Sequence, residues 1–135
     1  MPFFVLSENL LIGIQKMDEE HQYLVDLINE LYEFMSKGNG KDIIEKTIVG
    51  LISYIEFHFK NEEKLLSDYG YPEYRDHLSK HYKLIKEVKE IQENFSNGQL
   101  LVTSEISNFL KEWLTQHIMI SDKGYARFLK AKGVR

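Results

Sequence analysis

The sequence predicts an all-α protein, an up-down-up-down antiparallel four-helix bundle with an N-terminal arm and a short C-terminal helical tail. In four long segments, apolar residues recur at steps of three and four, the spacing of one helical face. The two prolines and most of the eight glycines fall between these segments. The connections are short, so consecutive helices should be antiparallel neighbours. The 135 residues suit one domain, and we expect residues 1–135 to form it.

The first helix is expected to begin near Asp18, a residue type that caps helix N-termini, and to end in segment 36–40. The second is expected to run from about Ile44 to Leu66, before the turn residues 68–72. Their predicted inner faces are His21, Leu24, Val25, Ile28, Leu31, Tyr32 and Met35, and then Ile44, Ile48, Leu51, Ile52, Ile55, Phe59, Glu62 and Leu66.

Pro72 is well placed to open the third helix, because the missing N–H of proline costs nothing in a first turn. Segment 94–98 is expected to end that helix, and Thr103 or Ser104 to cap the fourth. The inner faces are His77, His81, Leu84, Ile85, Val88, Ile91 and Phe95, then Ile106, Phe109, Leu110, Trp113, His117 and Ile120, with Tyr125 and Phe128 as apolar contacts of the basic tail.

Composition excludes several functional classes. With 17 basic and 21 acidic residues and no basic stripe, the chain lacks the footprint of a nucleic-acid-binding protein. The absence of cysteine excludes disulfides, thiolate nucleophiles and cysteine-ligated metals. No apolar run approaches the ~18 residues of a membrane span, and segment 1–6 does not resemble a signal peptide. We expect a cytoplasmic monomer without nucleic-acid or membrane partners, and leave protein partners open.

Two pairs of polar residues interrupt the apolar faces. His58 precedes Glu62 by four residues, and His77 precedes His81 by four. Residues at i and i+4 share one helix face, so each pair can point at one centre. Either spacing alone is common and therefore weak evidence.

A third pair, His117 and Asp122, is separated by five residues. On an ideal helix such residues lie about 140° apart. Both can therefore reach one site only if the helix loosens or ends there, and Gly124 supplies a plausible end.

The antiparallel topology is expected to place these residues at one end of the bundle. In an antiparallel bundle, the starts of the first and third helices and the ends of the second and fourth share one end of the molecule. Singly, each polar residue has a plainer explanation as a hydrogen-bonded core histidine or a solvated acid. A metal-free cluster of this size would leave buried polar groups poorly paired. The residues predicted within about two turns of that end are His21, His58, Glu62, His77, His81, His117 and Asp122.

The size of the cluster predicts two metal ions rather than one. Two six-coordinate ions offer twelve positions, of which five imidazoles fill five and two bridging carboxylates fill four. A bridging oxygen atom fills two more, so one position stays open for a small ligand. Mixed imidazole and carboxylate ligation suits iron, with manganese, zinc or copper as competitors.

The pattern His21, His58-x3-Glu62, His77-x3-His81, His117-x4-Asp122 resembles hemerythrin, and specifically the single-domain bacterial hemerythrins, over essentially the whole chain. The resemblance implies two non-haem iron ions with an oxo or hydroxo bridge that bind dioxygen reversibly. It implies that three histidines hold one iron and two hold the other, with two bridging carboxylates. The implied sets are His77, His81 and His117; His21 and His58; and Glu62 and Asp122.

The resemblance further implies an apolar pocket around the open iron, formed by Leu24, Phe59, Leu114 and Ile118. The alternative is that these four residues are simply core.

Two positions depart from the bacterial family, which usually has Gln where this chain has Glu20 and Trp near the position of Leu6. Glu20 and Glu63 are candidates to accept the ring N–H of a ligand histidine, or are plain surface acids.

Three functional classes remain open at this stage. The favoured class is dioxygen carriage, storage or sensing, in which the protein is not an enzyme. The alternative is a di-iron enzyme acting on dioxygen, peroxide or nitric oxide. Such sites in ferritin-like bundles are rich in carboxylates with Glu-x-x-His spacing, whereas histidine dominates here. A third class is iron storage or a zinc-filled structural site.

Overall fold

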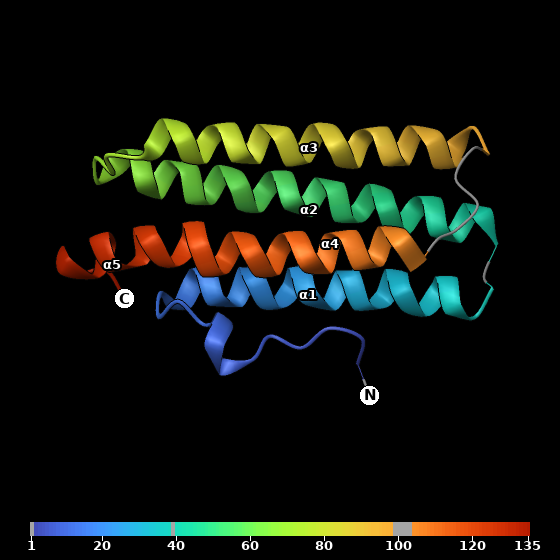
Figure 1. Ribbon diagram of the computed structural model, residues 1–135, viewed down its shortest axis with the longest axis horizontal. Coiled ribbons are helices and arrows are strands. Elements are labelled where there is room, and N and C mark those ends of the chain that lie inside the picture. The colour runs from blue at the N-terminus through green and yellow to red at the C-terminus, as the bar shows by residue number, and fades with distance from the viewer. Residues whose placement is uncertain (1, 39, 99–103) are drawn as a thin grey trace.

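The computed structural model describes residues 2–38, 40–98 and 104–135 of the chain, and its centre is a bundle of four long helices lying side by side (Figure 1). Helix α1 packs against α2 and α4, and α2 also packs against α3. Consecutive helices run in opposite directions (Figure 1). Within the described residues there is no strand, so the predicted four-helix bundle is confirmed. The helices are α1 (Gln15–Ser36), α2 (Lys41–Asp68), α3 (Tyr74–Ser96) and α4 (Ser104–His117).

The last helix continues beyond α4. A five-residue π-helical segment, η2 (Ile118–Asp122), leads directly into α5 (Lys123–Ala131). The helix α5 therefore extends α4 past the end of the bundle, next to the start of α1 and the C-terminus (Figure 1). This is the predicted helical tail.

Two expected helix starts need correction. Helix α1 begins at Gln15, and Asp18 lies inside it. The Asp18 carboxylate accepts hydrogen bonds from the backbone N–H groups of Ile12 (2.8 Å) and Gly13 (3.0 Å). Asp18 therefore fixes the turn that precedes the helix instead of capping its first turn. Pro72 lies in the turn two residues before α3, which begins at Tyr74.

The turn after α2 shows why that helix stops. Gly70 has a φ of +68°, a conformation that favours glycine. The N–H of Tyr71 bonds to the carbonyl of Leu66 at 3.0 Å, and the N–H of Gly70 to that of Ser67 at 3.2 Å. These bonds use carbonyls that the helix end leaves free. For the fourth helix, Thr103 lies outside the described residues and Ser104 is the first helical residue.

The N-terminal arm, which includes the short 3₁₀ helix η1 (Glu8–Leu10), lies along the bundle (Figure 1). Phe4 is buried, and its backbone exchanges two 2.8 Å hydrogen bonds with the side chain of Asn29. The ring of Phe3 stacks on Tyr32 with centroids 4.1 Å apart. The arm thus docks through phenylalanines, and the residue at Leu6 does not prevent it.

Residues 2–38, 40–98 and 104–135 contain no helix with the length and uninterrupted apolar character of a membrane span.

Candidate metal centre

The seven predicted ligands meet at one end of the bundle. The structure places them where α1 and α3 begin, where α2 ends, and where α4 passes into η2. None of the seven is more than 6% exposed to solvent. The seven residues therefore lie at the depth that antiparallel topology predicts, and they are His21, His58, Glu62, His77, His81, His117 and Asp122.

These side chains form two groups that share one carboxylate. One group contains Glu62 with His77, His81 and His117, and the other contains Glu62 with His21 and His58. Within each group, the atoms that could bind a metal lie within 4.8 Å of one another. We call these groups the three-histidine position and the two-histidine position.

Glu62 divides its two oxygen atoms between the positions. Its Oε1 lies 2.6 Å from Nε2 of His77 and 2.9 Å from Nε2 of His81. Its Oε2 lies 3.4 Å from Nε2 of His58 and 3.8 Å from Nε2 of His21. A carboxylate placed in this way can bridge two ions.

The two carboxylate oxygens of Asp122 are also divided between the two positions. Its Oδ2 lies 3.1 Å from Nε2 of His21, on the two-histidine side. Its Oδ1 lies 3.3 Å from Nε2 of His77 and 3.2 Å from Nε2 of His117, on the three-histidine side. Asp122 is thus a second carboxylate that spans both positions.

The π-helical segment explains how His117 and Asp122 reach one centre. The N–H of Lys123 bonds to the carbonyl of Ile118, five residues earlier, instead of four as in an α-helix. This wider turn brings residues five apart towards the same face. The helix was expected either to loosen or to end here, and the structure shows that it loosens. It does not end at Gly124, which lies inside α5.

Unpaired buried atoms show that the cluster suits a cation. Both ring nitrogens of His21 and both carboxylate oxygens of Asp122 are buried without a hydrogen-bond partner. Nε2 of His81 and Nε2 of His117 face each other at 3.2 Å. Two ring nitrogens so close together need a proton or a metal ion between them, and unpaired buried polar groups are costly. The donors are imidazole nitrogens and carboxylate oxygens, a set that fits iron.

The electrostatics of the metal-free cluster also favour positive charge. Burial lowers the pKa of His21, but Asp122 and Glu62 outweigh burial and raise it to about 10. Against the same effect of burial, the same two carboxylates raise the pKa of His77 to about 9. Burial acts to raise the pKa of Glu62, yet the four histidines around it, His21, His58, His77 and His81, hold it well below its usual range. The carboxylates are therefore charged and attract cations.

Carboxylates also lie on the outer side of two of the ligand rings, which is one of the two alternatives left open for Glu20 and Glu63. Oε1 of Glu20 lies 2.6 Å from Nδ1 of His58, and Oε2 of Glu63 lies 2.7 Å from Nδ1 of His81. In each ring, Nε2 faces the centre and Nδ1 faces the carboxylate. Glu20 and Glu63 are therefore placed to orient the rings.

Tyr125 has a role that the sequence reasoning missed, since it was expected only as an apolar contact of the tail. Its buried hydroxyl donates a hydrogen bond of 2.7 Å to Oε2 of Glu62. Burial and the neighbouring Glu62 raise the pKa of this hydroxyl well above its usual value. Its position three residues after Asp122, hence on the same helix face, was the available signal.

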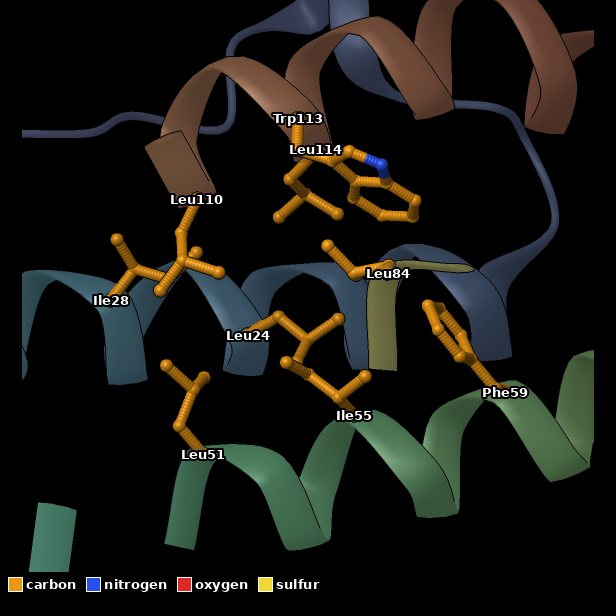
Figure 2. A pocket seen from close by; sticks show the side chains of 9 residues that line it. All are labelled: Leu24, Ile28, Leu51, Ile55, Phe59, Leu84, Leu110, Trp113 and Leu114. Atoms are coloured by element: carbon orange, nitrogen blue, oxygen red, sulfur yellow. The ribbon is translucent and has the colours of Figure 1, made fainter. Parts of the chain in front are cut away.

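An apolar cavity lies in the core of the bundle (Figure 2). Two rings of its lining stack on ligand histidines, Phe59 on His81 with centroids 3.6 Å apart and Trp113 on His117 at 4.4 Å. The cavity offers about 20 Å³ to the centre of a water-sized molecule, which is room for one small ligand. Three of the four residues expected around an oxygen pocket, Leu24, Phe59 and Leu114, are among its lining residues, whereas Ile118 is fully buried but lies outside the lining. All four helices contribute to the lining, which Ile28, Leu51, Ile55, Leu84, Leu110 and Trp113 complete (Figure 2).

Comparison with known proteins identifies the family. Residues 12–129 match the family described as "Hemerythrin HHE cation binding domain". The chain belongs to the hemerythrin family. Among curated hemerythrin relatives, the bacteriohemerythrin of Pseudomonas aeruginosa is 34% identical over 125 residues, which is 93% of this chain and 80% of that protein. The bacteriohemerythrin of Methylococcus capsulatus is 32% identical over 114 residues, covering 84% of this chain and 86% of its own length.

Solved hemerythrin structures share the fold. A wild-type hemerythrin superposes with a TM-score of 0.80 at 31% identity, covering 84% of this chain and 87% of that one. A hemerythrin variant superposes with a TM-score of 0.88 at 27% identity, covering 94% and 97% of the two chains. The family resemblance seen in the sequence is thus confirmed.

Proposed function

We propose that this chain binds dioxygen reversibly at a non-haem di-iron centre. In this proposal His77, His81 and His117 hold one iron, and His21 and His58 hold the other. Glu62 and Asp122 would each offer one oxygen to each ion, and an oxo or hydroxo group would complete the centre. The iron pair, when bound, supplies the electrons that dioxygen takes up on binding and returns on release.

The unequal division of the ligands carries the proposal. Each carboxylate places one oxygen towards each position, yet one position has three imidazoles and the other has two. If both ions share the two carboxylates and the oxygen bridge, the ion at the two-histidine position has one protein ligand fewer than the ion at the three-histidine position. A vacancy of this kind accepts one small ligand without displacing a side chain.

The cavity supports the proposal because it offers an apolar environment for dioxygen. Its walls are leucine, isoleucine, phenylalanine and tryptophan side chains (Figure 2). A water molecule needs two to four polar partners to be held in a cavity, and these walls offer few. Leu24, Phe59 and Leu114 therefore exclude water and deny protons a hydrogen-bonded route to the vacancy.

We further propose that residues 1–135 act as one hemerythrin unit. The arm is tied to α1 through Phe4 and Asn29, and α5 contributes Tyr125 to the centre. Both extensions of the bundle thus support the same site.

Anaerobic loading with ferrous iron tests the function. The loaded chain should hold two irons by elemental analysis, colour on exposure to air, and lose the colour when purged, over repeated cycles. The variant Glu62→Gln should lose the two-iron stoichiometry, while Glu56→Gln, at an acid of α2 that pairs with Lys89 of α3 away from the site, should hold two irons like the parent. One iron per chain would overturn the assignment. Irreversible bleaching or product formation would favour the enzyme.

A further inference from the structure

The two metal positions differ in the carboxylate that stands behind their ligands. At the two-histidine position, Glu20 contacts His58, and its side chain is 8% exposed. At the three-histidine position, Glu63 contacts His81, and its side chain is 24% exposed. The distances are nearly equal, at 2.6 and 2.7 Å. The two contacts therefore differ chiefly in how much solvent reaches the carboxylate.

Glu20 is held at both of its oxygen atoms. Oε1 contacts Nδ1 of His58, and Oε2 accepts a 2.9 Å hydrogen bond from Nδ2 of Asn61 on α2. Glu20 itself belongs to α1, directly before the ligand His21. This contact joins the two helices that supply the histidines of one metal position.

The buried contact acts on the strength of His58 as a ligand. An imidazole that binds a metal through Nε2 carries its proton on Nδ1, and a carboxylate that accepts this hydrogen bond makes the ring a better electron donor. Solvent weakens such an effect, whereas burial preserves it. The other ligand ring at this position, His21, has no hydrogen-bond partner at Nδ1. The two-histidine position therefore depends on Glu20 for this support.

We propose that Glu20, held by Asn61, is a positioning residue that strengthens His58 and thereby tunes the metal at the two-histidine position. An electron-rich ligand stabilises the higher oxidation state more than the lower one. Glu20 thus favours the ferric state of the ion next to the vacancy and sets how readily that ion gives up an electron. The inference rests on the proposed di-iron centre and deepens it, because it assigns separate control to one of the two ions.

Titration of the metal-free full chain with Co²⁺ tests the effect on affinity without iron or dioxygen. Visible absorption of Co²⁺ should report two binding steps. The variant Glu20→Gln keeps size and hydrogen bonding but removes the charge, and it should weaken one step about tenfold, the lower end for loss of such a partner. Glu63→Gln should weaken the other step by less. Glu19→Gln, at the exposed neighbouring acid of α1, is the matched control and should change neither.

Spectroelectrochemistry of the iron-loaded chain tests the effect on electron transfer. In Glu20→Gln, a tenfold loss of preference for ferric iron raises one of the two midpoint potentials by about 59 mV. Asn61→Ala releases Glu20 without removing its charge, so it should raise the same potential by less. A residue with a purely structural role would change thermal stability and leave both potentials in place.

The outcomes separate this inference from the proposed function. If Glu20→Gln weakens both Co²⁺ steps equally, or neither, Glu20 does not tune one position and the inference fails. If one step and one potential shift as expected while the loaded parent never binds dioxygen, the inference stands and the proposed function fails.

Discussion

The interior of the bundle is polar at one end and mainly apolar at the other. At the end where α1 begins, five histidines and two acids fill the space between the helices. At the end where α1 stops, the described buried residues are mostly apolar, among them Leu31, Ile48 and Phe95, and the buried hydroxyl of Ser107 contacts the sulfur of Met35. The same four helices thus carry an aliphatic core at one end and a charged one at the other.

The difference shows what each end needs in order to be stable. Aliphatic side chains gain stability simply by leaving water, in proportion to the area they bury. Buried imidazoles and carboxylates gain nothing until their charges and hydrogen bonds are matched. The apolar end can therefore be stabilised by burial alone, whereas the polar end needs protons or a metal ion to match its buried groups.

Metal removal should have the largest effect, and it should act on one end. At a metal concentration a thousand times its dissociation constant, binding contributes about 4 kcal/mol to stability, and chelation removes this contribution. Hydrogen exchange should accelerate around His21 and His58 and change little around Leu31 and Ile48. Exchange that accelerates uniformly along the helices would contradict the prediction that metal removal acts on one end.

A cavity at the apolar end should cost nearly as much but leave the metals in place. Ile48 is 2% exposed, and Ile48→Ala should lower the free energy of unfolding by about 2–5 kcal/mol. Val49, the next residue on α2, is 49% exposed, and Val49→Ala should cost well under 1 kcal/mol. Chemical denaturation gives both values, and metal analysis should find full occupancy in each variant. Metal loss from Ile48→Ala would show that the two ends are coupled.

The pH dependence of metal binding should distinguish the polar end. In the metal-free chain the pKa of His21 is raised to about 10 and that of His77 to about 9. Both rings are protonated between pH 7 and 8 and must lose their protons to bind metal. Binding there should release about two protons and strengthen about a hundredfold per pH unit, or roughly 2.7 kcal/mol. Metal titrations in buffers of different ionisation enthalpy count the protons.

The metal-free chain should show the opposite pH trend. Because these pKa values are raised above the ordinary 6.5 of histidine, their contribution to folding is fully present below pH 6.5. It is lost progressively as the pH rises from about 6.5, and it is gone above about 10. Denaturation of the metal-free chain should therefore show falling stability over that range, and a stability that rose there would contradict the assigned charges.

The smallest effect on stability should come from the boundary between the two ends. Leu114 lines the cavity, and Leu114→Asn should cost about 1–3 kcal/mol by burying a poorly paired amide. The amide also admits water and a proton route, so autoxidation should accelerate with both irons retained. Ile118→Gln tests the predicted pocket residue outside the lining, and should have the weaker effect on autoxidation. Folded, fully metallated Leu114→Asn that autoxidises at the parent rate would show that Leu114 is only core.

The sequence predicted the helices and the level of the site because both follow from periodicity. Residues such as His58 and Glu62 share a face at i and i+4, and antiparallel topology then sets their depth. Helix starts were less predictable, since Asp18 binds backbone groups upstream of its own helix. No composition rule distinguishes this use of an aspartate from an N-cap.

Other features of the site depended on details that periodicity does not record. A π turn follows from how a helix is packed, so the loosening between His117 and Asp122 was expected only as one of two possibilities. The hydroxyl of Tyr125 was missed because its ring fits an apolar face and its polar tip was ignored. The roles of Glu20 and Glu63 were recognised as possibilities but needed the measured contacts to separate them from surface acids.

The wider turn at Ile118–Asp122 holds one residue more than an α-helical turn would. Deleting a single codon between His117 and Asp122 would therefore let the segment wind as a regular α-helix, with Asp122 four residues after His117 and still on the same face. Tyr125 and Leu129, both now fully buried, would keep their places in the bundle. A deletion between Asp122 and Tyr125 would instead leave the wide turn in place and rotate Tyr125 and Leu129 together by about 100° around the helix axis. Evolution can therefore lose a residue inside the wide turn, but not between that turn and the residues that pack after it.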